Sequence, residues 1–209
     1  MKGIFLFFFL LHVPDVMWAQ TSDSDVAAWY LPGVSWQVSK KVSLVGELGY
    51  NQYYTAGLGY LQGFITVHKN LVLNPGYIYY GYKNSGQEYR QEHFLMNSVI
   101  GQLPMGKFLL DDRNTLWNRI SYHAEPLHYY RNRLRLIRSF LLGHAGAKVY
   151  GYDEAFYQFN SGRWMRNRLA LGASYDVLRH ANLDITYIRQ WDHSSGWLHL
   201  FFITATWKI

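Results

Sequence analysis

Apolar residues alternate with polar or small residues along most of this chain, and no other feature constrains its fold as strongly. Between positions 168 and 177, every odd position is apolar and most even positions are polar or glycine. Segments 42–51, 130–142 and 183–187 show similar alternation. A period of two places one kind of side chain on each face of a β-strand, and no segment shows a comparable helical stripe. The sequence therefore predicts an all-β protein whose strands separate two different environments.

The predicted strands are long. They run for about 11–15 residues between turn signals, whereas strands of globular sheets are most often 5–6 residues long. Short turns alternate with connections that are mostly longer and more polar, as in transmembrane barrels with tight periplasmic turns and larger outer loops. A tilted strand needs roughly 9–11 residues to cross a membrane. The expected fold is an antiparallel transmembrane β-barrel.

The number of strands is less constrained than the fold class. The segments with a strand pattern are residues 25–38, 42–53, 59–67, 71–82, 89–102, 108–120, 129–142, 148–159, 163–177, 182–191 and 197–207. These are eleven segments, whereas bacterial single-chain barrels have even strand numbers. A break at Pro32-Gly33 would give twelve strands, and a first segment outside the wall would leave ten. The sequence predicts 10–12 strands and leaves the choice open.

The N-terminus has the features of an export signal. Lys2 precedes an apolar stretch at residues 3–13, and Ala19 is a small residue before a cleavage site at Gln20. This stretch is shorter than the roughly 20 residues that a transmembrane helix needs. We therefore expect a cleaved signal peptide at residues 1–19 and a barrel domain at residues 20–209, in the outer membrane of a Gram-negative bacterium. The expected partners are outer-membrane lipid, lipopolysaccharide and, during insertion, the barrel-assembly machinery, and the oligomeric state is open.

The composition agrees with a wall that has lipid on one side. Apolar residues make up 49% of the chain and aromatic residues 18%, but charged residues only 16%, against about a quarter in typical soluble domains. A chain so rich in aromatic residues is not expected to be disordered. The absence of cysteine excludes disulfides, cysteine-ligated zinc sites and cysteine nucleophiles.

Arginine is concentrated in the second half of the chain. All twelve arginines lie between Arg90 and Arg189, and the net charge is +6. A guanidinium that faces lipid at the bilayer midplane costs roughly 2–4 kcal/mol, so arginines on the polar side of their strands are expected to face the lumen. The predicted lumen network, or solute-binding wall, comprises Glu47, Glu92, Arg113, Arg119, Arg131, Arg133, Arg135, Glu154, Arg166 and Arg168.

Two interpretations of this wall are open. Ladders of arginine and carboxylate can fill a small barrel with satisfied polar groups, which would be a structural role. The excess of arginine over acidic residues instead favours a narrow channel or pocket for small anionic solutes. Nucleic-acid binding, the usual inference from a basic chain, is not expected, because the arginines are spread at strand spacing inside an exported chain.

An outer-membrane enzyme that acts on lipid or lipopolysaccharide is the alternative function. A hydrolase needs a nucleophile and a base within reach of each other, and a histidine-carboxylate group could also bind a divalent metal. The candidates lie in or beside two predicted outer loops: His123, Glu125 and His128 in one, and His193, Ser194, Ser195 and His199 around the other. None of their spacings is diagnostic, so the sequence predicts no catalytic residue, no metal site and no cofactor.

Four segments carry a family resemblance. They are LLDDRNTLWNRI at residues 109–120, YYRNRLRL at 129–136, YGYDEAF at 150–156 and RNRLALG at 166–172. With these segments the mature chain resembles domain of unknown function family 2490, a group of uncharacterised bacterial outer-membrane β-barrel proteins. The family pattern has an acidic residue followed by an arginine near Glu92, whereas Phe94 stands at the arginine position here. The resemblance implies the barrel fold and supplies no activity.

Overall fold

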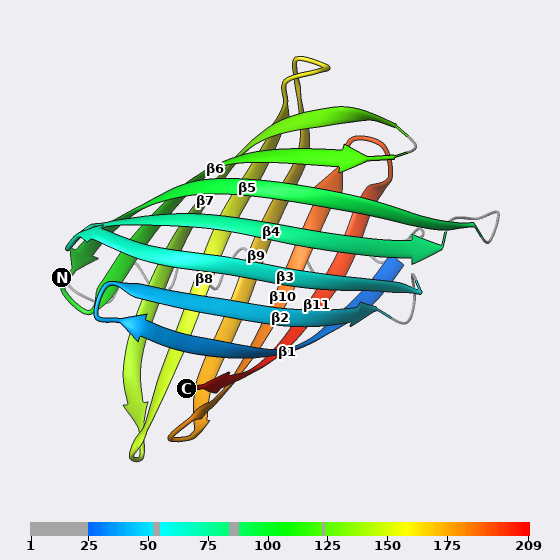
Figure 1. Ribbon diagram of the computed structural model, residues 1–209. Helices are drawn as coiled ribbons and strands as arrows, with labels where there is room; N and C mark the ends of the chain where they lie inside the picture. Colours follow the sequence, from blue (N-terminus) through cyan, green and yellow to red (C-terminus); the bar gives the residue numbers. More distant parts are fainter. Residues whose placement is uncertain (1–24, 52–54, 84–87, 123) are drawn as a thin grey trace, which may run out of the picture.

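The chain forms a closed β-barrel. The computed structural model describes residues 25–51, 55–83, 88–122 and 124–209. The strands are β1 (Asp25–Ser39), β2 (Val42–Asn51), β3 (Ala56–His68), β4 (Leu71–Lys83), β5 (Tyr89–Met105), β6 (Phe108–Ser121), β7 (Ala124–Leu142), β8 (Ala145–Gln158), β9 (Arg163–Leu178), β10 (Ala181–Asp192) and β11 (Gly196–Lys208). The strands are strongly tilted, so the near wall, β1 to β6, crosses the far wall in Figure 1. The prediction of an all-β barrel is confirmed. The described residues contain no helix that is long and apolar enough to cross a membrane.

The barrel has eleven strands and closes through a parallel pair. Consecutive strands pair antiparallel, and β1 pairs in parallel with β11, from Asp25 opposite Leu198 to Ser35 opposite Lys208. With an odd number of alternating strands, the first and the last point the same way, so only a parallel ladder can join them. The predicted range of 10–12 strands is confirmed, and all eleven segments with a strand pattern join the wall.

The predicted break at Pro32-Gly33 does not divide the first strand. Pairing between β1 and β2 holds at Tyr30, is interrupted at Leu31 and Pro32, and resumes at Gly33 in the same register. Proline has no N–H to donate to a neighbouring strand, and on its other side Pro32 stays in register with Ala205 of β11. The strand therefore tolerates the proline as a local gap in one ladder.

The first predicted outer loop is largely strand. Residues 121–128 were expected to form a connection, but β7 begins at Ala124, so that Ser121 pairs with Ala124 and Asn118 with His128. Tight turns join the strands at the opposite end of the barrel. Gly106 and Gly143 in these turns have φ values of 61° and 64°, a region that residues other than glycine rarely enter.

The two faces of the wall differ as the alternation predicts. Outward-facing Leu169 and Leu171 are 59% and 61% exposed, whereas Ala170 between them is buried. The buried apolar residues form two small clusters, one around Ala27, Ala170, Ile188 and Leu200, and one around Trp29, Leu31 and Ala56. Between and beside these clusters the barrel interior is polar.

Candidate functional site

A cavity of about 750 Å³ lies inside the barrel. All ten residues selected from the sequence line it: Glu47, Glu92, Arg113, Arg119, Arg131, Arg133, Arg135, Glu154, Arg166 and Arg168. The alternation of side chains along each strand explains this placement. These residues lie on the inward face of their strands, together with the buried residues two positions away. The structure thus brings the ten side chains together, and their role in binding a solute stays a prediction.

One row of charged side chains crosses the wall from β6 to β9. Arg113 of β6 lies opposite Arg133 of β7, Arg133 opposite Glu154 of β8, and Glu154 opposite Arg168 of β9. Directly opposed residues on one face of an antiparallel pair have Cβ atoms about 5 Å apart. Strand register therefore places three guanidiniums and one carboxylate next to one another.

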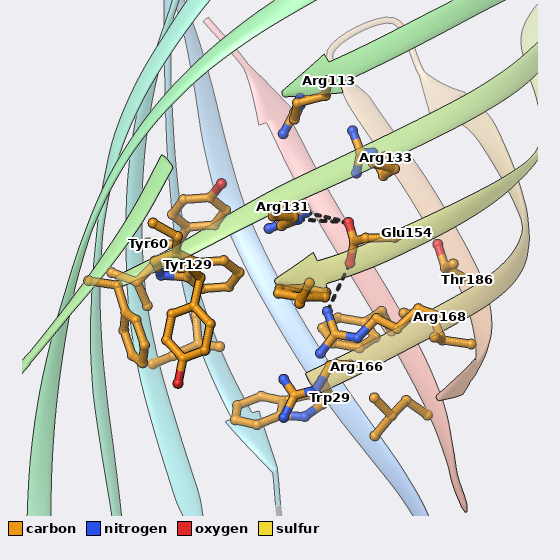
Figure 2. A pocket seen from close by; sticks show the side chains of 18 of the residues that line it. Trp29, Tyr60, Arg113, Tyr129, Arg131, Arg133, Glu154, Arg166, Arg168 and Thr186 are labelled. Atoms are coloured by element: carbon orange, nitrogen blue, oxygen red, sulfur yellow. Dashed lines mark hydrogen bonds and ion pairs between the residues drawn. The ribbon is translucent and has the colours of Figure 1, made fainter. Parts of the chain in front are cut away.

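Glu154 is the one carboxylate of this row and is almost completely buried. Its Oε1 accepts a hydrogen bond from Nε of Arg131 at 2.8 Å and lies 2.7 Å from Nη2 of the same guanidinium. Its Oε2 accepts one from Nη1 of Arg168 at 3.1 Å, and Arg168 Nε donates to Gln190 at 2.6 Å. Figure 2 shows Glu154 between the two arginines. One carboxylate thus compensates part of the positive charge of two arginines.

Three other arginines of the cavity have their own carboxylates. Arg166 donates from Nε and Nη2 to Oδ2 of Asp192, at 2.8 and 2.5 Å. Arg135 lies 3.3 Å from Asp111, and Arg119 lies 3.5 Å from Glu92. These contacts and those of Glu154 match the structural interpretation, in which arginine-carboxylate pairs fill the barrel.

The lumen network predicted from the sequence did not include Asp192, and for the neighbouring pair Asp111 and Asp112 the sequence alone does not show which carboxylate faces inward. Asp192 lies one residue beyond the predicted end of its strand, but it continues the inward-facing positions of Thr186 and Gln190. Extending the alternation by one residue would have found it. Asp111 faces inward and pairs with Arg135, whereas Asp112 faces outward.

Arg113 and Arg133 differ from the other arginines of the cavity. Among the described residues, neither forms an ion pair with a carboxylate. The Nε of each is also buried without a hydrogen-bond partner, as are those of Arg119 and Arg135. Each of these guanidiniums lies over an aromatic ring. The Arg113 guanidinium lies 5.9 Å from the ring centre of Phe64, and the Arg133 guanidinium lies 5.3 Å from the ring centre of Tyr152. The two arginines lie together at one end of the site in Figure 2.

Arginines outnumber carboxylates in the cavity lining. Among the described residues that line it are seven arginines and four carboxylates, the latter being Glu47, Glu92, Glu154 and Asp192. Asp111, which pairs with Arg135, and Asp184, which accepts a hydrogen bond from Tyr150, lie behind this lining and reduce the excess of positive charge. Glu47 makes no hydrogen bond or ion pair with any described residue. Gly33 of the neighbouring strand makes room for it, because a Cβ on Gly33 would lie 2.7 Å from Cγ of Glu47.

An apolar wall shares the cavity with the arginines. It consists of Trp29, Leu31, Leu58, Tyr80 and Phe202, from β1, β3, β4 and β11. The Trp29 ring stacks on Phe202 with centroids 6.4 Å apart and lies 6.1 Å from Tyr80. The sequence did not indicate this wall, because the faces of the closing strand are poorly distinguished by polarity.

The histidines considered for catalysis have other partners. His193 Nε2 lies 3.2 Å from Nη1 of Arg163, and the rings of His199 and His128 hydrogen-bond to Tyr187 and Asn118 at 2.6 and 2.7 Å. Within the described ranges, none of these imidazoles contacts a serine hydroxyl or a carboxylate. His123 lies outside them, and no three potential metal ligands gather within them.

The hydroxyl of Ser194 also lacks a general base of the expected kind. It donates to Oδ1 of Asp192 at 2.8 Å, and the other oxygen of that carboxylate is engaged by Arg166. A serine nucleophile is normally activated by an adjacent base. The described geometry therefore gives no support to a hydrolase at this rim.

Comparison with known proteins identifies the family. A search of curated proteins gives no match. A family model described as "Protein of unknown function (DUF2490)" matches residues 18–197, which include most of the barrel and the whole arginine wall. The chain therefore belongs to the DUF2490 family of proteins of unknown function.

Proposed function

We propose that this protein is an outer-membrane β-barrel that forms a narrow channel for small anionic solutes. The outward face supports the membrane location. Leu48, Leu61, Leu116, Leu169 and Leu171, on four different strands, are each more than half exposed. Soluble monomers rarely expose contiguous apolar patches larger than a few hundred Å², whereas lipid and the acyl chains of lipopolysaccharide would cover such a surface. Insertion of a closed barrel would require the barrel-assembly machinery.

The single observation that carries the anionic solute is a pair of buried arginines without ion-pair partners. Seven arginines and four carboxylates line the cavity, and even with Asp111 and Asp184 behind this lining, Arg113 and Arg133 form no ion pair with a described carboxylate. Positive charge in a cavity with low-dielectric walls raises the local concentration of anions. A purely structural ladder would pair each buried arginine, because an unpaired buried charge is costly.

Cell fractionation tests the location. The full chain, expressed in a Gram-negative host, should be found with outer-membrane markers in a density gradient, and its N-terminal residue should be Gln20. Recovery in the soluble periplasmic fraction, or an uncleaved N-terminus, would contradict the proposed location or processing, respectively.

Planar-bilayer recording tests the solute class. In a KCl gradient, the purified barrel should give a reversal potential that favours chloride over potassium. Arg113→Gln combined with Arg133→Gln should weaken this preference, whereas Arg138→Gln, on the outward face of the same strand as Arg133, should leave it unchanged. A barrel without conductance, or with conductance that does not prefer anions, would overturn the channel.

A further inference from the structure

The cavity has two chemically different walls, and a small inorganic anion would use only one of them. The arginine wall on β6 to β9 offers charge, and the apolar wall (Trp29, Leu31, Leu58, Tyr80 and Phe202) offers hydrocarbon and ring surface. Trp29 and Leu31 are already buried, whereas Leu58, Tyr80 and Phe202 are only partly buried and still expose apolar surface. A ligand with an apolar part would remove this remaining surface from water, which favours its binding.

The arginine wall contains one place where guanidinium groups are free to bind a ligand. Glu154 is occupied by Arg131 and Arg168, and Asp111 by Arg135. Arg113 and Arg133 lie opposite each other in adjacent strands, and no described carboxylate binds them. Arg113 is only 8% exposed, so its charge is held in a site from which bulk water is largely excluded.

Arginine is well suited to bind an oxyanion here. Its planar fork of N–H donors matches the oxygens of a carboxylate or a phosphate, and charge-assisted hydrogen bonds of this kind are stronger than neutral ones. The rings of Phe64 and Tyr152 lie near the two guanidiniums. Neither ring carries a negative charge, so the N–H donors of both guanidiniums remain without an anionic partner. The pair therefore has the donors that one anionic head group needs.

The size of the cavity fits an organic molecule. Its volume of about 750 Å³ lies within the roughly 300–1,000 Å³ of typical small-molecule sites, which are mostly apolar with a few placed polar groups. The paired arginines and the apolar wall line this same cavity. Figure 2 shows Arg113 and Arg133 at one end of the site and Trp29 at the other, with Arg131 and Glu154 at heights between them.

We propose that the cavity binds an amphipathic organic oxyanion. Its carboxylate or phosphate is held between Arg113 and Arg133, and its hydrocarbon part lies against the apolar wall. This inference rests on the proposed function and narrows its solute class from any small anion to one with an apolar body. It also gives the unpaired arginines and the apolar wall a common role.

Calorimetry on the purified barrel in lipid nanodiscs tests the solute class, with empty nanodiscs as the blank for partitioning into lipid. Octanoate and octyl phosphate are the probes, acetate and inorganic phosphate carry the head groups alone, and octylammonium carries the same chain with the opposite charge. At least one octyl anion should bind about tenfold or more tighter than its head group alone, because the chain buries apolar surface. Octylammonium should show no saturable binding. The carboxylate and phosphate arms identify the preferred head group.

Variants separate the two halves of the site. Arg113→Gln with Arg133→Gln should weaken binding of the octyl anions by about tenfold or more, because two charge-assisted contacts are lost. Arg133→Lys, which keeps the charge but loses the fork, should fall between this variant and the parent. Phe202→Ala should reduce the advantage of the octyl chain and spare chloride selectivity, and Arg138→Gln should change neither. A heat-dependent gel shift shows that each variant folds.

The outcomes distinguish this inference from the proposed function. If acetate and inorganic phosphate bind as tightly as their octyl forms while chloride selectivity holds, the amphipathic solute is wrong and the anion channel stands. If octylammonium binds as well as octanoate and octyl phosphate, the arginine head-group site is wrong. If no probe binds and the barrel shows no anion preference, both proposals fall.

Discussion

At the scale of single residues, Glu154 determines how much buried positive charge the barrel can carry. Both of its oxygens are used, one by Arg131 and one by Arg168, and its side chain is 2% exposed. Breaking a buried ion pair by removing one partner leaves the other charge without compensation. We expect Glu154→Gln to lower the free energy of unfolding by about 3–5 kcal/mol, measured by urea unfolding in lipid vesicles.

A surface acid serves as the matched control for this variant. Glu88 is 73% exposed and lies 3.8 Å from the half-exposed Arg90, and exposed pairs contribute only about 0–1 kcal/mol. Glu88→Gln should therefore leave the unfolding midpoint nearly unchanged. Equal effects of the two substitutions would show that Glu154 does not hold the charge balance of the lumen.

A neutral buried contact gives a second residue-scale prediction. The hydroxyls of Ser98 and Thr115 lie 2.8 Å apart and both are buried. Thr115→Val keeps the shape but leaves the Ser98 hydroxyl without this partner, which should cost about 1–3 kcal/mol. Adding Ser98→Ala should recover most of that loss, as urea unfolding of the single and double variants will show. Strictly additive losses would mean that the two hydroxyls do not depend on each other.

At the scale of elements, strands β6 and β7 carry a polar group on the face that we propose meets lipid. This outer polar cluster consists of Asp112, Asn114, Tyr130 and Asn132. Asn132 donates to Asp112 at 2.7 Å and to Asn114 at 3.1 Å, Asn114 donates to Asp112 at 3.1 Å, and Tyr130 hydrogen-bonds to Asn114. Each oxygen of the carboxylate thus has a donor, which lowers the cost of exposing it to lipid.

Substitutions in this outer polar cluster should act in opposite directions. Asn132→Leu alone should lower the unfolding free energy in vesicles by about 1–3 kcal/mol, because Asp112 loses a donor. Asp112→Leu, Asn114→Leu and Asn132→Leu together should restore or exceed the parent stability, because an apolar surface suits lipid. A triple variant less stable than Asn132→Leu would contradict a lipid-facing position for these two strands.

Local alternation predicts elements and their faces, and it predicts contacts between strands much less well. It was sufficient to identify every strand and to place the ten charged residues on one side of the wall. It could not show that Arg113 and Arg133 lack carboxylates while Glu154 serves Arg131 and Arg168, because pairing depends on register across β6 to β9. A shift of one residue reverses the faces, and only the assembled sheet fixes which charges meet.

At the scale of the whole molecule, closure is the property that the sequence left open. The alternation of β1 is interrupted at Pro32-Gly33 and that of β11 is indistinct. The sequence of neither strand therefore indicates which strand it pairs with. The parallel pair that they form joins the first and the last strand, which are far apart in the sequence. Pairing of strands so distant in sequence costs loop-closure entropy before the contacts between them form. This pairing can be identified only when all eleven strands are in place.

Cysteine cross-linking provides a direct test of this closure, because the chain has no cysteine of its own. Ala28 lies opposite Phe201 in the parallel register, and neighbouring strands are about 4.8 Å apart, within the Cα separation of roughly 4.4–6.8 Å that a disulfide spans. Ala28→Cys with Phe201→Cys should therefore form an intramolecular disulfide on oxidation of the folded barrel, seen as a mobility shift that a reductant reverses.

The control pair, Ala28→Cys with Ala205→Cys, keeps both thiols on the outward face but moves one by four residues along β11. A strand rises about 3.3 Å per residue, so this pair is too far apart to be oxidised in the folded barrel. Cross-linking of the control in preference to the registered pair would mean that β1 meets β11 in another register. Absence of both cross-links would mean that the barrel closes without β1, through ten strands.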